Sequence, residues 1–243
     1  MQRTLLIGLL LLTACQVSPP PSTATATRFI PTLPPATVTP TLPPPPTSTP
    51  TPAPRFFVEE FENPPTQWTT LYASGETGQT NLSQQNGKLT FELYGLNTWL
   101  YAIYNAYLYE AVHLETRVEA SGGQVNAMGL ICHYNEQSGW YEFNLSSEGD
   151  YNLLYGQWLA EGIARYTLIR SETSERIQRG NALNELGLDC ANNNVQLYIN
   201  GKLIRKIDVS RFGLTGGKVG IAVASFDDLP VILSFDWFKV NEP

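Results

Sequence analysis

The sequence predicts an all-β domain, built as a two-sheet antiparallel β-sandwich, behind an N-terminal segment of different composition. Apolar and polar residues alternate with a period of two in several segments, most cleanly over 88–94, 114–120, 141–145 and 195–199. This period is typical of half-buried β-strands. No segment carries a helical apolar stripe over ten residues. About a dozen short strands at this spacing favour two packed sheets.

Turn signals separate the predicted strands. Asn200-Gly201 stands between Tyr198-Ile199 and Leu203-Ile204, which predicts a hairpin with a type I′ turn because both turn residues tolerate positive φ. Further turn signals follow the same spacing and are Asn86-Gly87, Ser121-Gly122-Gly123, Glu148-Gly149-Asp150, Gly216-Gly217 and Asp227-Asp228.

Composition changes sharply near residue 55. Of the 18 prolines, 14 lie between Pro19 and Pro54, in a stretch also rich in Thr. Proline fixes φ and removes a backbone donor, so neither helix nor sheet propagates there. Such chains favour extended polyproline II, at about 3.1 Å per residue. We therefore expect residues 15–54 to form a disordered Pro/Thr-rich stalk and residues 55–243 to form one folded domain.

The N-terminus has the features of a secretion signal. Arg3 precedes the apolar run Leu5–Leu12, which is shorter than the about 20 residues that a membrane-spanning helix needs. It predicts a signal peptide over residues 1–14. The sequence Leu12-Thr13-Ala14-Cys15 resembles the bacterial lipobox. This resemblance implies that Cys15 is acylated, that membrane lipid is a partner, and that the protein is extracytoplasmic and lipid-anchored at the cell surface.

Two cysteines remain besides Cys15. Cys132 and Cys190 both fall in predicted strands of the folded domain, so an oxidising compartment predicts a disulfide between them. Removal of residues 1–14 takes away Arg3, one of 15 basic residues, and leaves 14 against 22 acidic residues, a net charge of −8. Because no basic patch is present either, nucleic acid is not an expected partner.

A set of short motifs recurs in a fixed order through residues 56–241. In this order and spacing they resemble the concanavalin A-like lectin/glucanase jelly roll, and more narrowly its LamG-like and exo-inulinase C-terminal-like members. The resemblance implies two stacked curved sheets, the concave one often carrying a carbohydrate site. The motifs are Phe61…Trp68, Gly87-Lys88-Leu89, Gly129-Leu130-Ile131-Cys132, Trp140-Tyr141-x-Phe143, Gly149-x-Tyr151, Asn184…Cys190, Leu197-Tyr198-Ile199-Asn200-Gly201, Gly217-x-Val219-Gly220 and Phe235-Asp236-x-Phe238-x-Val240.

The motif of the β-glucan-cleaving enzymes of this fold, Glu-x-Asp-x-Glu on one strand, is not found in the sequence. The nearest string is Glu115-x-Arg117-x-Glu119. An arginine between two carboxylates favours their ionised form, which is unsuitable for a general acid. A ladder of neutralised charges on a solvated strand face explains the string better. We therefore lean against an enzyme.

Aromatic and polar residues that share strand faces are the best indication of a binding site. Trp140, Glu142 and Asn144 fall on one face of their strand, and Trp99 and Tyr101 share a face of another. Flat rings that stack on sugars, beside groups that bond hydroxyls, are the chemistry of a carbohydrate site. The alternative is that these rings belong to the core. Trp140, with two polar neighbours on its face, is the least core-like.

Three weaker candidates complete the site. Tyr151 falls on the next strand, and His133, one residue after Cys132, is expected to point to the opposite face and line a groove. The resemblance also implies adjoining first and last strands, where Glu60 and Asp236 are candidates for a structural Ca²⁺ site. Ordinary surface acids are the equal alternative. No cofactor is otherwise expected.

These observations lead to one expected function and two alternatives. We expect a membrane-anchored lipoprotein that presents a non-catalytic, carbohydrate-binding jelly-roll module to a polysaccharide or glycoconjugate. The first alternative is a glycoside-active enzyme of the keto-disaccharide hydrolase or lyase type. The second is a structural protein-interaction domain of the cell envelope. Two or more convergent carboxylates in a cleft would indicate the enzyme.

Overall fold

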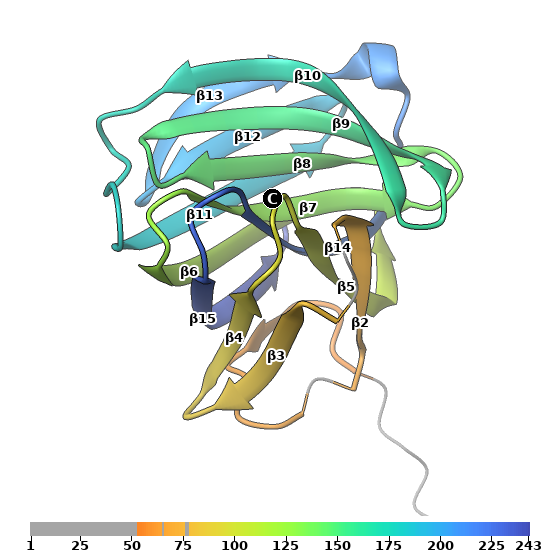
Figure 1. Ribbon diagram of the computed structural model, residues 1–243. Coiled ribbons are helices and arrows are strands. Elements are labelled where there is room, and N and C mark those ends of the chain that lie inside the picture. Colours follow the sequence, from red (N-terminus) through yellow and green to blue (C-terminus); the bar gives the residue numbers. More distant parts are fainter. Residues whose placement is uncertain (1–52, 65, 76–77) are drawn as a thin grey trace, which may run out of the picture. The chain divides into compact units, whose positions relative to one another are not determined.

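The computed structural model describes residues 53–64, 66–75 and 78–243. Fifteen strands and one short 3₁₀ helix, η1 (Ser210–Phe212), make up this part of the chain. The strands form two antiparallel sheets that stack face to face (Figure 1). The prediction of an all-β, two-sheet sandwich is confirmed. Within the described residues, no helix is long and apolar enough to cross a membrane.

Sheet A has eight strands. Its order is β13 (Lys202–Asp208), β12 (Asn194–Ile199), β11 (Leu183–Ala191), β6 (Val112–Gly122), β15 (Val231–Asn241), β4 (Lys88–Leu93) and β3 (Thr80–Gln85), and β1 (Phe57–Glu59) pairs with the far end of β15.

Sheet B has seven strands, and in Figure 1 it lies in front of β11, β12 and β13. Its order is β10 (Ile163–Thr173), β9 (Asp150–Ala160), β8 (Gly139–Ser146), β7 (Asn126–Asn135), β14 (Gly217–Ser225), β5 (Trp99–Tyr109) and β2 (Trp68–Ser74).

The main core lies between the sheets and follows the alternation in the sequence. On β8, Tyr141, Phe143 and Leu145 face sheet A, and on β6 Leu114 and Val118 face sheet B. The β12–β13 hairpin turns at Asn200 (φ 48°) and Gly201 (φ 72°), as the Asn-Gly pair predicts. Because every second residue of a strand points the same way, one sequence pattern places a whole strand face in the core.

The predicted disulfide forms between Cys132 on β7 and Cys190 on β11. Their Cα atoms are 6.5 Å apart, and both side chains are buried in the main core. Since β7 belongs to sheet B and β11 to sheet A, the bond joins the two sheets directly.

Candidate functional site

The outer face of sheet B, turned away from sheet A, carries a second and smaller apolar cluster, here called the aromatic face. Central strands β7 and β8 are therefore buried on both sides. The buried members are Ala73, Tyr101, Ile103, Ile131, Tyr134, Trp140 and Ala222, and the half-buried ones are Leu71, Trp99, Trp158, Ala164 and Tyr166.

Glycines on neighbouring strands make room for these side chains. Trp140 pairs with Gly156, where an added Cβ would lie 2.3 Å from Cε2 of the indole. At Gly129 an added Cβ would lie 2.0 Å from Oδ1 of Asn144. Both contacts are far shorter than van der Waals distance, so only glycine lets the side chains of β8 lie flat on the sheet.

A single carboxylate, that of Glu142, lies in the middle of the aromatic face. Its Oε1 accepts hydrogen bonds from Trp99 Nε1 (3.0 Å) and Asn144 Nδ2 (2.9 Å). Its Oε2 accepts from the Tyr101 hydroxyl (2.5 Å) and from Trp140 Nε1 (3.1 Å). Complete burial raises the pKa of Glu142 above its usual value, although the four hydrogen bonds act in the opposite direction.

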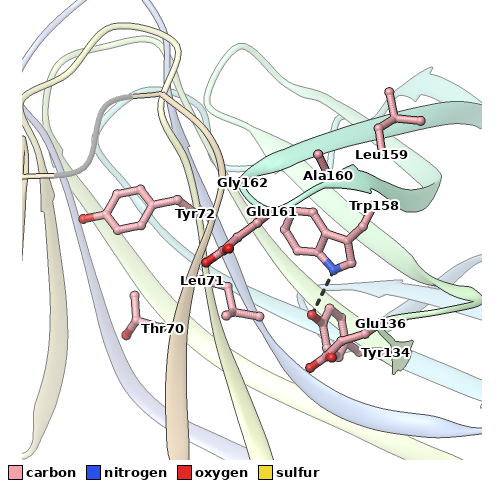
Figure 2. Close-up of a pocket in the computed structure, with 10 residues that line it drawn as sticks. All are labelled: Thr70, Leu71, Tyr72, Tyr134, Glu136, Trp158, Leu159, Ala160, Glu161 and Gly162. Carbon is pink, nitrogen blue, oxygen red and sulfur yellow. Dashed lines mark hydrogen bonds between the residues drawn. The ribbon is translucent and has the colours of Figure 1, made fainter.

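The outer face of sheet B has two hollows, and the larger one lies at the edge of the aromatic face, between β2 and the turns that follow β7 and β9. Its volume is about 730 Å³. Trp158 lies within it and donates a hydrogen bond from Nε1 to the Tyr134 hydroxyl (2.9 Å). Figure 2 shows the carboxylates of Glu136 and Glu161 in the same hollow as this indole, with Leu71 on the facing strand.

The hollow is closed on one side by the β9–β10 turn, which bends toward β2 (Figure 1). A Cβ added at Gly162 would lie 3.9 Å from the backbone oxygen of Tyr72 on β2. Gly162 has a φ of 71°, which favours glycine in this tight turn and places Glu161 at the rim.

On the floor of the hollow, burial raises the pKa of Tyr134, and its hydroxyl keeps its proton.

A second hollow of about 480 Å³ opens at the other end of sheet B. Trp99 and Phe226 form its apolar wall, with ring centroids 6.0 Å apart and an edge-to-face geometry. Asn152 lies in the wall and accepts a hydrogen bond from Asn144 (3.3 Å). The other lining residues are Asn97, Val125, Ala127, Ser146, Glu148, Asp150 and Asp227.

The Glu115-x-Arg117-x-Glu119 string lies on β6, on the outer face of sheet A and away from both hollows. Arg117 Nη2 is 2.6 Å from Oε1 of Glu185 on the neighbouring strand β11. Glu119 pairs with Lys88 at 3.2 Å. The charges form the neutralised cross-strand ladder that the sequence predicts.

The structure brings five of the predicted site residues together on the aromatic face: Trp99, Tyr101, Trp140, Glu142 and Asn144. The exposure of two of these side chains differs from the expectation. Trp140, expected to be the least core-like ring, is 0 % exposed, and Tyr101 is buried as well. The ring packs between Gly156 and Trp158, whose centroid is 5.0 Å from that of Trp140. In this arrangement, Trp140 supports the surface from beneath and does not reach a ligand.

Tyr151 and His133 do not join this group. Tyr151 faces sheet A in the main core, and its hydroxyl donates to Glu172 (2.6 Å). The expectation for His133 is wrong because β7 carries a bulge between Cys132 and Asn135, where His133 adopts a φ of 53°. The bulge resets the alternation, and the imidazole packs 6.0 Å from the ring of Tyr141, on the core side. Burial lowers the pKa of His133.

The predicted calcium ligands Glu60 and Asp236 find no partners for such a site. The first and last strands do adjoin, since β1 pairs with β15. However, Asp236 pairs with Lys88 at 3.0 Å. Across residues 53–64, 66–75 and 78–243, no group of three or more His, Cys, Asp or Glu side chains is arranged to hold a metal ion. Cys15 and residues 16–52 of the predicted stalk lie outside the described residues.

The sequence interpretation missed the residues that line the larger hollow. Trp158 extends the alternation of β9 beyond Tyr155, on the same face as Gly156. Following the period of two to the end of that strand would have found it. Glu136 and Glu161 lie in turns, where no periodicity operates, so only the tertiary structure brings them together.

Comparison with known proteins identifies the fold. The family 16 glycoside hydrolase of the Bacteroides ovatus mixed linkage glucan PUL, solved with a G4G4G3G product, matches with a TM-score of 0.55 and 12% identity over 76% of this chain and 99% of that one. A Bacillus licheniformis β-glucanase matches with a TM-score of 0.55 and 13% identity over 77% and 98%. The carbohydrate-binding module CBM66 from Bacillus subtilis matches with a TM-score of 0.51 and 13% identity over 70% and 92%.

The domain therefore has the concanavalin A-like jelly-roll fold, as the motif order indicates. No protein-family model and no curated protein matches the sequence. The similar solved structures are mostly glucanases and laminarinases by name. This finding contradicts the expectation of a non-catalytic binding module.

Proposed function

We propose that this domain is a glycoside-active enzyme and that its site is the larger hollow at the edge of the aromatic face. One observation carries the proposal: the carboxylates of Glu136 and Glu161 lie in the same hollow as the indole of Trp158 (Figure 2). Most glycosidases use two carboxylic groups, one as general acid and the other as base or nucleophile. An indole in the same hollow offers a flat apolar surface on which a sugar ring stacks.

The positions of the two carboxylates suit separate roles. Glu136 follows β7, and Glu161 lies in the turn between β9 and β10, so the two side chains reach the hollow from different turns. The floor between them is built from Trp158 and Tyr134, which are joined by a hydrogen bond. A sugar ring bound on this floor would have a carboxylate available from each turn.

The comparisons support glucans as the first substrates to test. The family 16 enzyme of Bacteroides ovatus was solved with a G4G4G3G product, and another similar structure is named a laminarinase. Fold alone does not fix a substrate, so a keto-disaccharide belongs in the same panel.

We propose further that the enzyme acts outside the cytoplasmic membrane, held there through Cys15. The apolar run Leu5–Leu12 and the sequence that ends at Cys15 support this location. Incorporation of labelled palmitate into the wild-type chain, and its loss in Cys15→Ser, would support the anchor. Equal labelling of both would exclude it.

The decisive experiment measures new reducing ends from mixed-linkage β-glucan, laminarin and a keto-disaccharide. We expect wild-type turnover on at least one substrate. Replacing either carboxylate, as Glu136→Gln or Glu161→Gln, should lower kcat by at least about 100-fold. Glu175→Gln is the matched control, because Glu175 is an exposed carboxylate in the β10–β11 connection. Absence of wild-type turnover, or full activity in both variants, would overturn the proposal.

A further inference from the structure

The buried carboxylate of Glu142 has no access to either hollow, yet its contacts lead to both. Four donors converge on it, two on each oxygen. Two of them are indole N–H groups, which can only donate. Together they use the full acceptor capacity of a carboxylate. None of the four donors carries a positive charge.

Such a residue is costly for the fold. A buried ionisable group without an opposite charge loses its hydration, which raises the free energy of the folded state. Removing it alone would leave four buried donors without an acceptor. The carboxylate therefore fixes the orientation of the groups that donate to it, and two of these are the indole rings of Trp99 and Trp140.

On one side, Glu142 fixes Trp99. The indole of Trp99 is half-buried and forms part of the wall of the second hollow, where it meets Phe226. Its only ring donor points inward to Oε1 of Glu142 at 3.0 Å. This bond fixes the side-chain torsion angles of Trp99. It therefore fixes which face of the indole lies toward the hollow.

On the other side, Glu142 fixes Trp140 beneath the larger hollow. Trp140 donates to Oε2 at 3.1 Å, and its ring lies 5.0 Å from Trp158 and 5.5 Å from Tyr134. Trp158 and Tyr134 are the floor of that hollow. The position of the floor therefore depends on a ring that Glu142 orients.

We infer that Glu142 is a positioning residue for binding of an extended glycan. It acts through Trp140 on the floor of the larger hollow, and through Trp99 on the wall of the second hollow, which we infer to bind a further part of the same glycan. The inference rests on the proposed function. A glutamine cannot replace the carboxylate, because its amide nitrogen donates and does not accept. In the glutamine variant, an NH2 group replaces one carboxylate oxygen, so the two groups that donate to that oxygen would face another donor. The indole among them would then turn or shift.

The test compares Glu142→Gln with wild type on the glucan that the full chain hydrolyses best. A residue that orients binding surfaces should raise KM at least about 10-fold and leave kcat within about threefold, because binding of ground state and transition state weakens together. Glu136→Gln and Glu161→Gln should show the opposite pattern, with a loss in kcat. The matched control is Glu119→Gln, an exposed carboxylate of sheet A.

Trp99→Phe keeps the test decisive if Glu142→Gln does not fold. It removes the N–H donor together with part of the half-buried ring, and it should raise KM in the same direction by a smaller factor. The inference is overturned if every variant that folds keeps the wild-type KM, or if Glu142→Gln loses kcat at unchanged KM. Either outcome leaves the proposed function standing.

The proposed function and this inference fail in distinguishable ways. If the wild type hydrolyses nothing, the function is overturned, and tryptophan fluorescence then measures binding of mixed-linkage β-glucan. Binding that is at least about 10-fold weaker in Glu142→Gln would still support the positioning role. Absence of binding to the wild type would overturn both.

Discussion

The two outer faces of the sandwich are built from the same alternating pattern and have opposite characters. On sheet A, charged side chains at alternate positions of β6 pair across strands with Glu185, Lys88 and Lys239 and remain partly exposed. On sheet B, the alternate positions of β8 hold Trp140 and Glu142, which are completely buried. Alternation determines which residues share a face. Whether that face meets water depends on what other strands place over it.

A buried carboxylate lies on each of these faces, and the two differ in their partners. Asp189 on β11 accepts bonds from the imidazole of His113, from the Tyr198 hydroxyl (2.7 Å) and from Gln196 (3.1 Å). Burial acts to raise the pKa of Asp189, but the bonds from His113 and Tyr198 outweigh it, and the pKa is lowered. Glu142 has neutral donors alone, and its pKa is raised. Asp189 differs from Glu142 in two ways: it has a cationic partner, and it is less completely buried.

The largest expected effect tests whether the two faces belong to one cooperative unit. The disulfide closes a 58-residue span between the sheets. Its loss in the double variant Cys132→Ala/Cys190→Ala should lower the free energy of unfolding by about 4 kcal/mol, because the unfolded chain gains entropy. Urea denaturation measures the change, and reduction of the wild type should reproduce it. Two separate transitions would show that the sheets unfold independently.

A matched glycine pair sharpens the comparison. Gly156→Ala on sheet B places a Cβ 2.3 Å from the buried Trp140 ring, so overpacking should cost about 1–3 kcal/mol. Gly187→Ala on sheet A places a Cβ 3.0 Å from Cβ of Tyr198, which needs a shift of only a few tenths of an ångström, and should cost less than about 1 kcal/mol. The urea midpoints of the two variants measure the two losses in stability. Equal losses would mean that the outer face of sheet A is packed as tightly as that of sheet B.

The His113–Asp189 pair should give sheet A a pH dependence that differs from that of Glu142, whose raised pKa makes its burial more costly as pH rises. The hydrogen bond to Asp189 raises the pKa of His113 above 6.5, so its contribution is complete below pH 6.5 and is lost as pH rises through the folded value. The lowered pKa of Asp189 contributes above pH 3.8 and is lost as pH falls through the folded value. The pair therefore stabilises most between about pH 4 and 6.5.

His113→Gln tests this pH dependence. The difference in unfolding free energy between wild type and variant should be greatest near pH 5.5 and shrink toward pH 9, with a maximum of about 1–3 kcal/mol for a charged hydrogen bond. Glu115, whose Oε1 lies 3.6 Å from Nε2 of His113, contributes in the same direction. A difference that does not change with pH would show that the imidazole acts by packing alone.

The smallest effect is expected from the charge ladder. Arg117→Ala removes a partly exposed pair with Glu185 and should lower the unfolding free energy by about 0.5 kcal/mol, since surface pairs are screened by water. In 1 M NaCl the difference should fall further, because the screening length is about 3 Å there. Chemical denaturation at two salt concentrations measures it. A loss that survives high salt would point to packing of the arginine stem on Trp237, which lies under its guanidinium at 5.9 Å.

The sequence by itself determined the strand periodicity, the Asn200-Gly201 hairpin and, outside bulges, the face that a strand residue takes. These are local properties, because a period of two and a turn preference need no knowledge of the neighbours. The Cys132–Cys190 bond is not local, but it was predictable because these are the two cysteines of the folded domain. The sequence also placed Glu142 beside Trp140 correctly. It failed at His133, where one extra residue in a bulge reverses the alternation.

Only the tertiary structure decided which face is buried and where the hollows lie. Trp140 is buried because glycines on neighbouring strands let it lie flat and because Trp158 covers it. Glu136 and Glu161 are 25 residues apart in the sequence, in separate turns, and meet in one hollow because the β9–β10 turn bends toward β2. Burial and convergence depend on which strands become neighbours and how the sheet curves, and these are sums over long-range contacts that no local pattern contains.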